Sequence, residues 1–136
     1  MKREVQVVGE LKLPGVERSV RRVRGFVRDV LGPDHPALDD VQTCASEAVT
    51  NAIVHTASGS AGGMVTVSLL TEGPEIVLEV TDDGAGGARP GFRNDPEGIH
   101  GRGMLIITAL ALKWTVRLDG DRSTVCMRFP GPLRRG

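Results

Sequence analysis

The chain has 136 residues, equal numbers of basic and acidic side chains, and few aromatic residues: three Phe, one Trp and no Tyr. This length suffices for one hydrophobic core, and residues 1–136 are expected to form a single domain without linkers or repeats. The charge balance and the lack of aromatic stacking surfaces argue against nucleic-acid binding, and no apolar run is long enough to span a membrane.

The N-terminus carries no signal-peptide pattern, and the two cysteines, Cys44 and Cys126, lie in apolar patterns without CxxC spacing. We therefore expect the buried, reduced thiols of a cytoplasmic protein rather than a disulfide or a metal site. The three histidines are too scattered along the chain to indicate a zinc site.

The first thirty residues predict a strand and a helix. Residues 4–13 alternate loosely between apolar and polar side chains, which predicts an edge strand ending at Pro14-Gly15. Over residues 16–31 valines recur at helical spacing with arginines on the remaining face, and Gly32-Pro33 ends this helix.

A second helix is expected from about Val41 to His55, with Asp39 or Asp40 as its N-cap. The small and polar residues 57–63 predict a loop after it.

The middle of the chain predicts a hairpin followed by a long loop. Its strands are expected over residues 64–71 and 75–81, with a turn at 72–74. Residues 82–103 are rich in glycine, and a structureless segment of this length in a compact domain is usually functional or disordered.

The last third predicts a helix over residues 104–112, strands over 114–118 and 123–129, and a frayed tail over 130–136. Strands grouped in hairpins, rather than alternating with helices, predict an α+β fold. We expect a two-layer α/β sandwich whose mixed, mostly antiparallel sheet is covered by helices on one face.

Three segments carry candidate chemistry, and the first is the second helix. Glu47, Asn51 and His55 lie four residues apart and therefore share one helix face, beside an alanine-rich packing side. Taken alone, this stripe is better explained as a solvated helix face.

The second segment is the end of the strand that leads into the glycine-rich loop. Asp82 places a carboxylate at the end of the strand, and Gly84 and Gly86 let the backbone approach a ligand closely. The alternative is a tight Asp-Gly turn, but a hairpin turn would lead directly into another strand.

The third segment is Gly101-Arg102-Gly103 followed by Met104. Glycines that open a helix expose backbone N–H groups at its positive end, which suits phosphate. Neither a Walker loop nor a dinucleotide-binding fingerprint occurs in the chain.

In this order the three segments resemble the GHKL or Bergerat ATP-binding fold shared by gyrase, heat-shock chaperone ATPases, sensor histidine kinases and mismatch-repair ATPases. The helix with Glu47 and Asn51 is similar to the N box of that superfamily. Residues 82–86 are similar to its DxGxG motif and residues 101–103 to its GxG motif. The resemblance spans residues 16–129.

The resemblance implies a role for each matching residue. Glu47 is expected to be the catalytic general base, and Asn51 to coordinate Mg²⁺. Asp82 is expected to bind the adenine amino group. The remaining cofactor-binding residues implied in this way are Gly84, Gly86, Gly101, Arg102, Gly103 and Met104.

Residues 87–100 are expected to form a lid over the bound nucleotide. Whether Arg89, Arg93 and His100 contact phosphate or are merely solvated stays open. For His55 a structural or supporting role is favoured.

Within this superfamily, the chain most resembles the small serine kinases that act as anti-sigma factors in bacterial partner-switching pathways. The resemblance rests on its length and on the segment SEAVTNAIVH, residues 46–55. This resemblance implies ATP and Mg²⁺ as cofactors, and a sigma factor and its anti-sigma-factor antagonist (STAS-type) as partners. It also implies a homodimer, with neither nucleic acid nor membrane as a partner. The alternative is a non-catalytic ATP-sensing module that sequesters proteins, and the presence of Glu47 favours the kinase.

Overall fold

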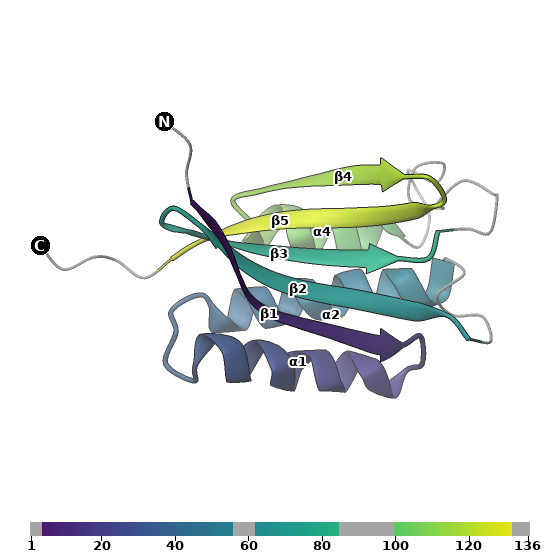
Figure 1. Ribbon diagram of the computed structural model, residues 1–136, viewed down its shortest axis with the longest axis horizontal. Coiled ribbons are helices and arrows are strands. Elements are labelled where there is room, and N and C mark those ends of the chain that lie inside the picture. The colour runs from purple at the N-terminus through teal and green to yellow at the C-terminus, as the bar shows by residue number, and fades with distance from the viewer. Residues whose placement is uncertain (1–3, 56–61, 85–99, 132–136) are drawn as a thin grey trace, which may run out of the picture.

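The computed structural model describes residues 4–55, 62–84 and 100–131, the side chains of residues 55, 100 and 102 excepted (Figure 1). Its described strands form one sheet in the order β1-β2-β3-β5-β4, and every pairing is antiparallel. The strands are β1 Val5–Pro14, β2 Met64–Glu72, β3 Glu75–Asp82, β4 Lys113–Asp119 and β5 Arg122–Pro130.

The described helices lie together on one side of this sheet (Figure 1). They are α1 Arg18–Leu31, α2 Leu38–His55 and α4 His100–Leu110. Helix α2 lies between the other two and contacts both of them as well as β2 and β3. The structure thus confirms the expected α+β two-layer sandwich and the place of the first strand at the sheet edge.

The core lies between the sheet and the helices, and its pattern follows from strand alternation. Val67, Val80 and Val125 are cross-strand neighbours in one buried row, and Leu69, Leu78 and Met127 form the next. Helix α2 contributes mainly small side chains to this core, so its backbone lies close to the sheet. Its buried apolar residues are Leu38, Val41, Cys44, Ala45, Ala48, Val49 and Ala52.

Helix α1 approaches the sheet closely at a bulge in β1. The strand register shifts between Val7 and Gly9, opposite Leu70 and Leu69. A Cβ atom on Gly9 would lie 2.8 Å from Val30 Cγ2 and 3.2 Å from Phe26 Cε1. Glycine at this position therefore allows α1 to pack directly against the edge strand.

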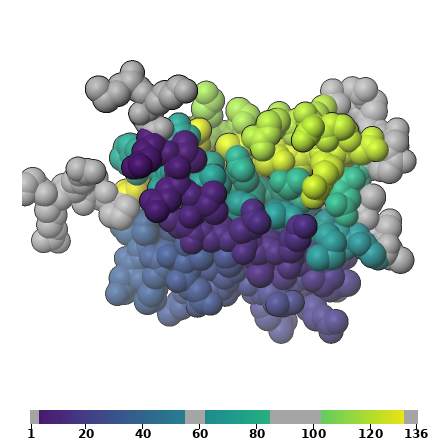
Figure 2. Space-filling model, viewed as in Figure 1, coloured from purple at the N-terminus to yellow at the C-terminus, as the bar shows by residue number. Residues whose placement is uncertain are grey.

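The other face of the sheet is turned toward the viewer in Figure 2. Charged side chains lie on this face. Arg128 of β5 pairs with Glu72 at 2.9 Å and with Glu75 at 3.2 Å, joining β5 to the β2–β3 hairpin. Cys126 on this face is half-buried, whereas Cys44 is fully buried in the core. The expectation of a buried thiol is therefore confirmed for Cys44 and wrong for Cys126.

Several helix boundaries differ from those expected, most clearly in α2 and α4. Helix α2 begins at Leu38, so Asp39 and Asp40 lie inside its first turn and the prediction that one of them is the N-cap is wrong. In the first turn their negative charges interact favourably with the positive end of the helix dipole. Helix α4 begins at His100 and ends at Leu110, so the glycines of residues 101–103 belong to its first turn instead of preceding it.

Some expectations fall on residues that the structure does not describe: the loop after α2 up to residue 61, the lid over residues 87–99 and the tail beyond residue 131. No helix in the described part of the chain is both long and apolar enough to cross a membrane.

Candidate functional site

The first wall of the site is the contact between α2 and the start of α4. Glu47 and Asn51 lie on the face of α2 that meets Gly103. A Cβ atom on Gly103 would lie 3.1 Å from Asn51 Nδ2 and 3.2 Å from Glu47 Oε1. The absence of a side chain at this position lets the first turn of α4 reach the carboxylate and amide of α2. The structure thus joins two segments that lie about fifty residues apart in the sequence.

Asn51 has an orientation suited to a cation. Its Nδ2 donates a weak hydrogen bond to Met104 Sδ at 3.7 Å. Because the amide nitrogen is directed to sulfur, the amide oxygen Oδ1 is the atom available to a hard cation such as Mg²⁺, which prefers oxygen. In the described part of the chain no three His, Cys, Asp or Glu side chains gather as a metal site. A cation here would therefore need ligands beyond the protein, such as phosphate oxygens and water.

The start of α4 adds a positive electrostatic end to this wall. The first N–H groups of a helix have no partner within it and carry partial positive charge, which favours phosphate. Gly101 and Arg102 lie in this first turn. The wall therefore combines an anion-binding backbone with the Glu47 carboxylate and the Asn51 amide.

The second part of the site surrounds Asp82 at the end of β3. Its side chain is buried, 4% exposed, and both carboxylate oxygens accept hydrogen bonds. The Gly84 N–H donates to Oδ1 at 2.6 Å, and the Ser123 hydroxyl donates to Oδ2 at 2.9 Å. A carboxylate can accept about four hydrogen bonds, so Asp82 retains acceptor capacity for a ligand donor.

Burial raises the pKa of Asp82, and the charge of Asp83 raises it further. The hydrogen bonds from Gly84 and Ser123 oppose this effect because they stabilise the ionised form. A buried carboxylate held by donors of Gly84 and Ser123 is suited to accept a hydrogen bond from a neutral amine such as the adenine amino group.

The turn after Asp82 is fixed by the opposite hairpin. Gly84 has φ +74°, a conformation that glycine adopts readily, and a Cβ there would overlap the carbonyl oxygen of Asp121. The β4–β5 turn therefore supports the turn that carries the Asp82 site.

Asp83 has a structural role beside the site. Its Oδ2 accepts a hydrogen bond from the Met64 N–H at 2.8 Å, and its Oδ1 lies 3.9 Å from Arg122 Nη2. Asp83 thereby connects the start of β2 with the start of β5. Asp82 is the carboxylate of the pair that faces the core.

The structure thus brings Glu47, Asn51, Gly103 and Met104 into one cluster and Asp82 and Gly84 into another. The end of β3, the end of α2 and the start of α4 all lie at the same end of the molecule (Figure 1). The remaining predicted residues Gly86, Arg89 and Arg93 fall outside the described residues, and the side chains of His55, His100 and Arg102 are not among those described.

Sequence reasoning missed Ser123 and Asp121 as supports of the site. Both act across the β3–β5 pairing, which joins strands that are not consecutive in the chain. Only knowledge of strand order would place Ser123 opposite Asp82.

A buried carboxylate in a glycine-supported turn and a helix start that can accept an anion suit a nucleotide-binding domain of α+β fold. The family model described as "Histidine kinase-like ATPase domain" matches residues 13–129. The chain belongs to this family, and membership in an ATPase family implies ATP as the nucleotide.

Similar proteins include two named "Anti-sigma F factor". The one from Clostridium acetobutylicum is 45% identical over 56 residues, which are 41% of this chain and 38% of that protein. The one from Bacillus thuringiensis is 37% identical over 73 residues, 49% of this chain and 50% of that protein. The chain thus matches half or less of the length of these relatives.

The chain is also similar in fold to a solved structure. It is "The crystal structure of the RsbU and RsbW domains of Rv1364c from Mycobacterium tuberculosis", with a TM-score of 0.57 and 21% sequence identity. The match covers 93% of this chain and 35% of that chain. At this identity the likeness supports the fold and nothing finer.

Proposed function

We propose that this chain is an ATP- and Mg²⁺-dependent anti-sigma factor that phosphorylates a serine of an antagonist protein. The main support for this proposal is the contact between α2 and α4. The side chains of Glu47 and Asn51 lie next to Gly103, whose lack of a side chain lets the start of α4 approach them closely. Relatives named as anti-sigma factors support the regulatory part of the proposal.

ATP is the substrate, and each part of it meets a distinct chemical group. Asp82 accepts a hydrogen bond from the adenine amino group, and Gly84 and Gly86 let the backbone pass close to the base. The N–H groups at the start of α4, with Arg102, bind the phosphates. Asn51 Oδ1 would hold Mg²⁺ together with the phosphates, and the ion would neutralise phosphate charge.

Glu47 acts as the general base. As the serine oxygen forms its bond to the γ-phosphorus, the bond from that phosphorus to the β–γ bridging oxygen breaks and ADP leaves. The serine proton passes to the Glu47 carboxylate. Most of the rate enhancement then comes from positioning and charge neutralisation, so one base and one metal ligand suffice.

The regulatory part of the proposal concerns partners and assembly. The chain binds a sigma factor in one state and the antagonist in another, acts in the cytoplasm, and forms a homodimer of single-domain subunits. Light scattering during size-exclusion chromatography measures the assembly, and a monomer at micromolar concentration would contradict the dimer.

The test is phosphate transfer from labelled ATP to candidate antagonist proteins by the parent, Glu47→Gln and a matched control, Asp40→Asn. Asp40 lies on the same helix and is exposed in its first turn. We expect Glu47→Gln to lower the transfer rate by about 10²–10⁴-fold with ATP affinity retained, and Asp40→Asn to change it little. Equal transfer by Glu47→Gln and the parent would refute the base assignment.

A second candidate function is a non-catalytic ATP-sensing module that sequesters proteins. The proposed nucleotide contacts of Asp82 and Asn51 fit this module as well as they fit a kinase, because nucleotide binding requires no general base. This module predicts ATP-dependent partner binding without phosphate transfer by the parent, an outcome that the same assay detects.

A further inference from the structure

The side-chain amide of Asn51 in α2 has two ends of nearly equal shape, and one of them suits a cation. Its oxygen Oδ1 is an acceptor, whereas its nitrogen Nδ2 is a donor and repels a positive ion. A half-turn of the amide exchanges the two ends with little change in the space that the side chain fills. The orientation of this amide therefore decides whether α2 presents an oxygen ligand for Mg²⁺ or a positive N–H group.

Contact with Gly103 does not distinguish the two ends. A Cβ atom on Gly103 would lie 3.1 Å from Asn51 Nδ2 and 3.3 Å from Asn51 Oδ1, so both ends of the amide pack closely against the start of α4. Glu47 Oε1 lies 3.2 Å from the same point, and this carboxylate is an acceptor toward which the amide nitrogen could turn. Close packing at Gly103 therefore fixes the place of the amide but not the end at which its oxygen lies.

The side chain of Met104 distinguishes the two ends. In the described part of the chain, its Sδ accepts the hydrogen bond from Asn51 Nδ2, at 3.7 Å. A thioether sulfur accepts hydrogen bonds and cannot donate them, so the reversed amide would place two acceptors, Oδ1 and Sδ, against each other. Met104 is half-buried and packs against the core, which holds its sulfur beside the amide.

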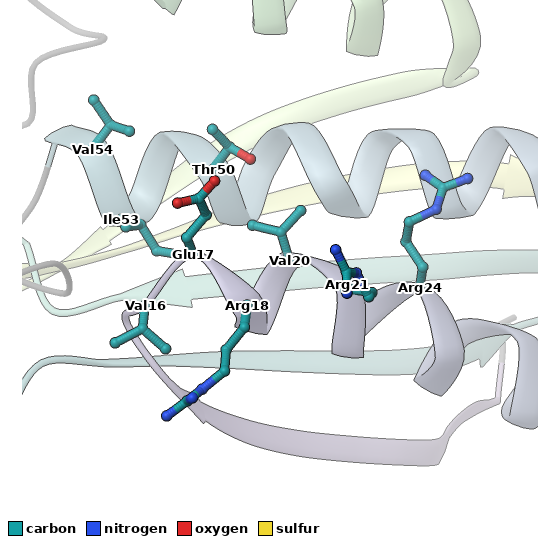
Figure 3. Close-up of a pocket in the computed structure, with 9 residues that line it drawn as sticks. All are labelled: Val16, Glu17, Arg18, Val20, Arg21, Arg24, Thr50, Ile53 and Val54. Atoms are coloured by element: carbon teal, nitrogen blue, oxygen red, sulfur yellow. The ribbon is translucent and has the colours of Figure 1, made fainter.

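The residue that precedes Asn51 on α2 points to a different surface. Thr50 lines a groove between α1 and α2 together with Val20 and Ile53 (Figure 3). Successive residues of a helix are about 100° apart, so the face on which Asn51 meets α4 is distinct from this groove. The contacts that orient the Asn51 amide therefore come from α4.

We propose that Met104 is a positioning residue that orients the Asn51 amide with Oδ1 toward the cation. The proposal rests on the proposed Mg²⁺ role of Asn51. Without the sulfur, Glu47 becomes the competing acceptor for Nδ2, and the amide presents its oxygen in only part of the population. The apparent affinity for the cation falls by that fraction, whereas nucleotide contacts made by other residues stay as they are.

The test is calorimetric titration of the parent, Met104→Leu and the matched control Met127→Leu with ATP, with and without Mg²⁺. Leucine is close to methionine in volume but has no acceptor. Met127 is buried in the core on β5, so its substitution makes the same chemical change away from Asn51. We expect Met104→Leu to lower the Mg²⁺ enhancement of ATP affinity by about threefold or more, and Met127→Leu to change it by less than about twofold.

ATP affinity without Mg²⁺ separates orientation of the amide from general support of α4. It should change by less than about twofold in both variants, because the amide of Asn51 matters only through the cation. A parallel loss of affinity with and without Mg²⁺ in Met104→Leu would assign Met104 a structural role instead and overturn the proposal.

A second measurement uses Asn51→Asp, because a carboxylate presents oxygen at both ends and has no wrong orientation. In this background Met104→Leu should change the Mg²⁺ enhancement by less than about twofold, so the two substitutions are not additive. If Asn51→Asp does not bind ATP, the comparison of Met104→Leu with Met127→Leu decides.

Three further outcomes would overturn the proposal: an unchanged Mg²⁺ enhancement in Met104→Leu, equal losses in Met104→Leu and Met127→Leu, or the same loss from Met104→Leu with and without Asn51→Asp. Failure of the proposed Mg²⁺ site gives a different result, since the parent itself would then show no enhancement. The positioning role of Met104 would fall with that site.

Discussion

Burial raises the pKa of Asp82, so ionising this carboxyl costs free energy in the folded protein. We predict that Asp82→Asn lowers ATP affinity by about 10- to 100-fold, since a hydrogen bond to a charged acceptor contributes about 1.5–3 kcal/mol. The same change should raise the free energy of unfolding at pH 7, because the buried charge is removed while Asn still accepts the Gly84 N–H.

The pH dependence of this effect has a defined sign. A carboxyl whose pKa is higher in the folded than in the unfolded state destabilises the fold above its folded pKa, and this cost disappears as pH falls through that value toward the unfolded one. The stability advantage of Asp82→Asn should therefore shrink on acidification. Urea unfolding at several pH values measures it, and a variant less stable than the parent at pH 7 would contradict the prediction.

Gly84 tests the support given by the β4–β5 turn. Gly84→Ala should lower the free energy of unfolding by more than about 2 kcal/mol, because the positive φ is strained for alanine and the Cβ overlaps the carbonyl of Asp121. Gly120→Ala is the matched control: it has φ +64° but no atom within 4 Å of the added Cβ. Chemical denaturation of both variants measures the free energy of unfolding. We expect Gly120→Ala to lower it by about 1–2 kcal/mol, less than Gly84→Ala. Equal losses would show that the Asp121 contact is unimportant.

At the scale of elements, the contact between α4 and α2 requires glycine at position 103, although alanine would favour the helix. Gly103→Ala gains about 1 kcal/mol of propensity, but its Cβ lies 3.1–3.3 Å from the Asn51 amide, which must shift. We predict little net change in stability and a loss of Mg²⁺-dependent ATP binding.

Gly25→Ala in α1 provides the control, since nothing lies within 4 Å of its added Cβ. It should raise the free energy of unfolding by about 0.5–1 kcal/mol and leave ATP binding unchanged. Thermal denaturation and calorimetric titration measure both effects. Parent-like nucleotide binding by Gly103→Ala would contradict the proposed role of the α2–α4 contact.

Most elements could be predicted because their apolar residues recur at clear periods. The valines of α1 and the alternation of β2, β3 and β5 predict the layers that the structure contains. The start of α2 could not be predicted in this way. His35 Nδ1 accepts the Ala37 N–H at 3.0 Å, and the His35 carbonyl oxygen accepts the Leu38 N–H, so the helix starts without an Asp cap.

The site was predictable only in parts. Glu47, Asn51 and Asp82 were identified from motifs, but the meeting of Glu47 and Asn51 with Gly103 depends on how α4 packs against α2. The contribution of Ser123 depends on β5 pairing with β3. Both are long-range contacts, and local sequence patterns carry no information on them.

At the scale of the whole molecule, α2 is the element that connects the other described helices with the sheet. One of its faces meets α4 at Gly103, beside the proposed nucleotide site, and its buried residues pack on β2 and β3.

We propose that ATP–Mg²⁺ binds between Asp82 and the Glu47–Asn51 wall. Calorimetric titration of the parent, Asn51→Ala and the neighbouring control Thr50→Ala, with and without Mg²⁺, tests this site. We expect Mg²⁺ to strengthen ATP binding by the parent and by Thr50→Ala but not by Asn51→Ala, and GTP to bind at least about tenfold more weakly than ATP. Failure of the parent to bind ATP, or an equal Mg²⁺ effect in Asn51→Ala, would contradict it.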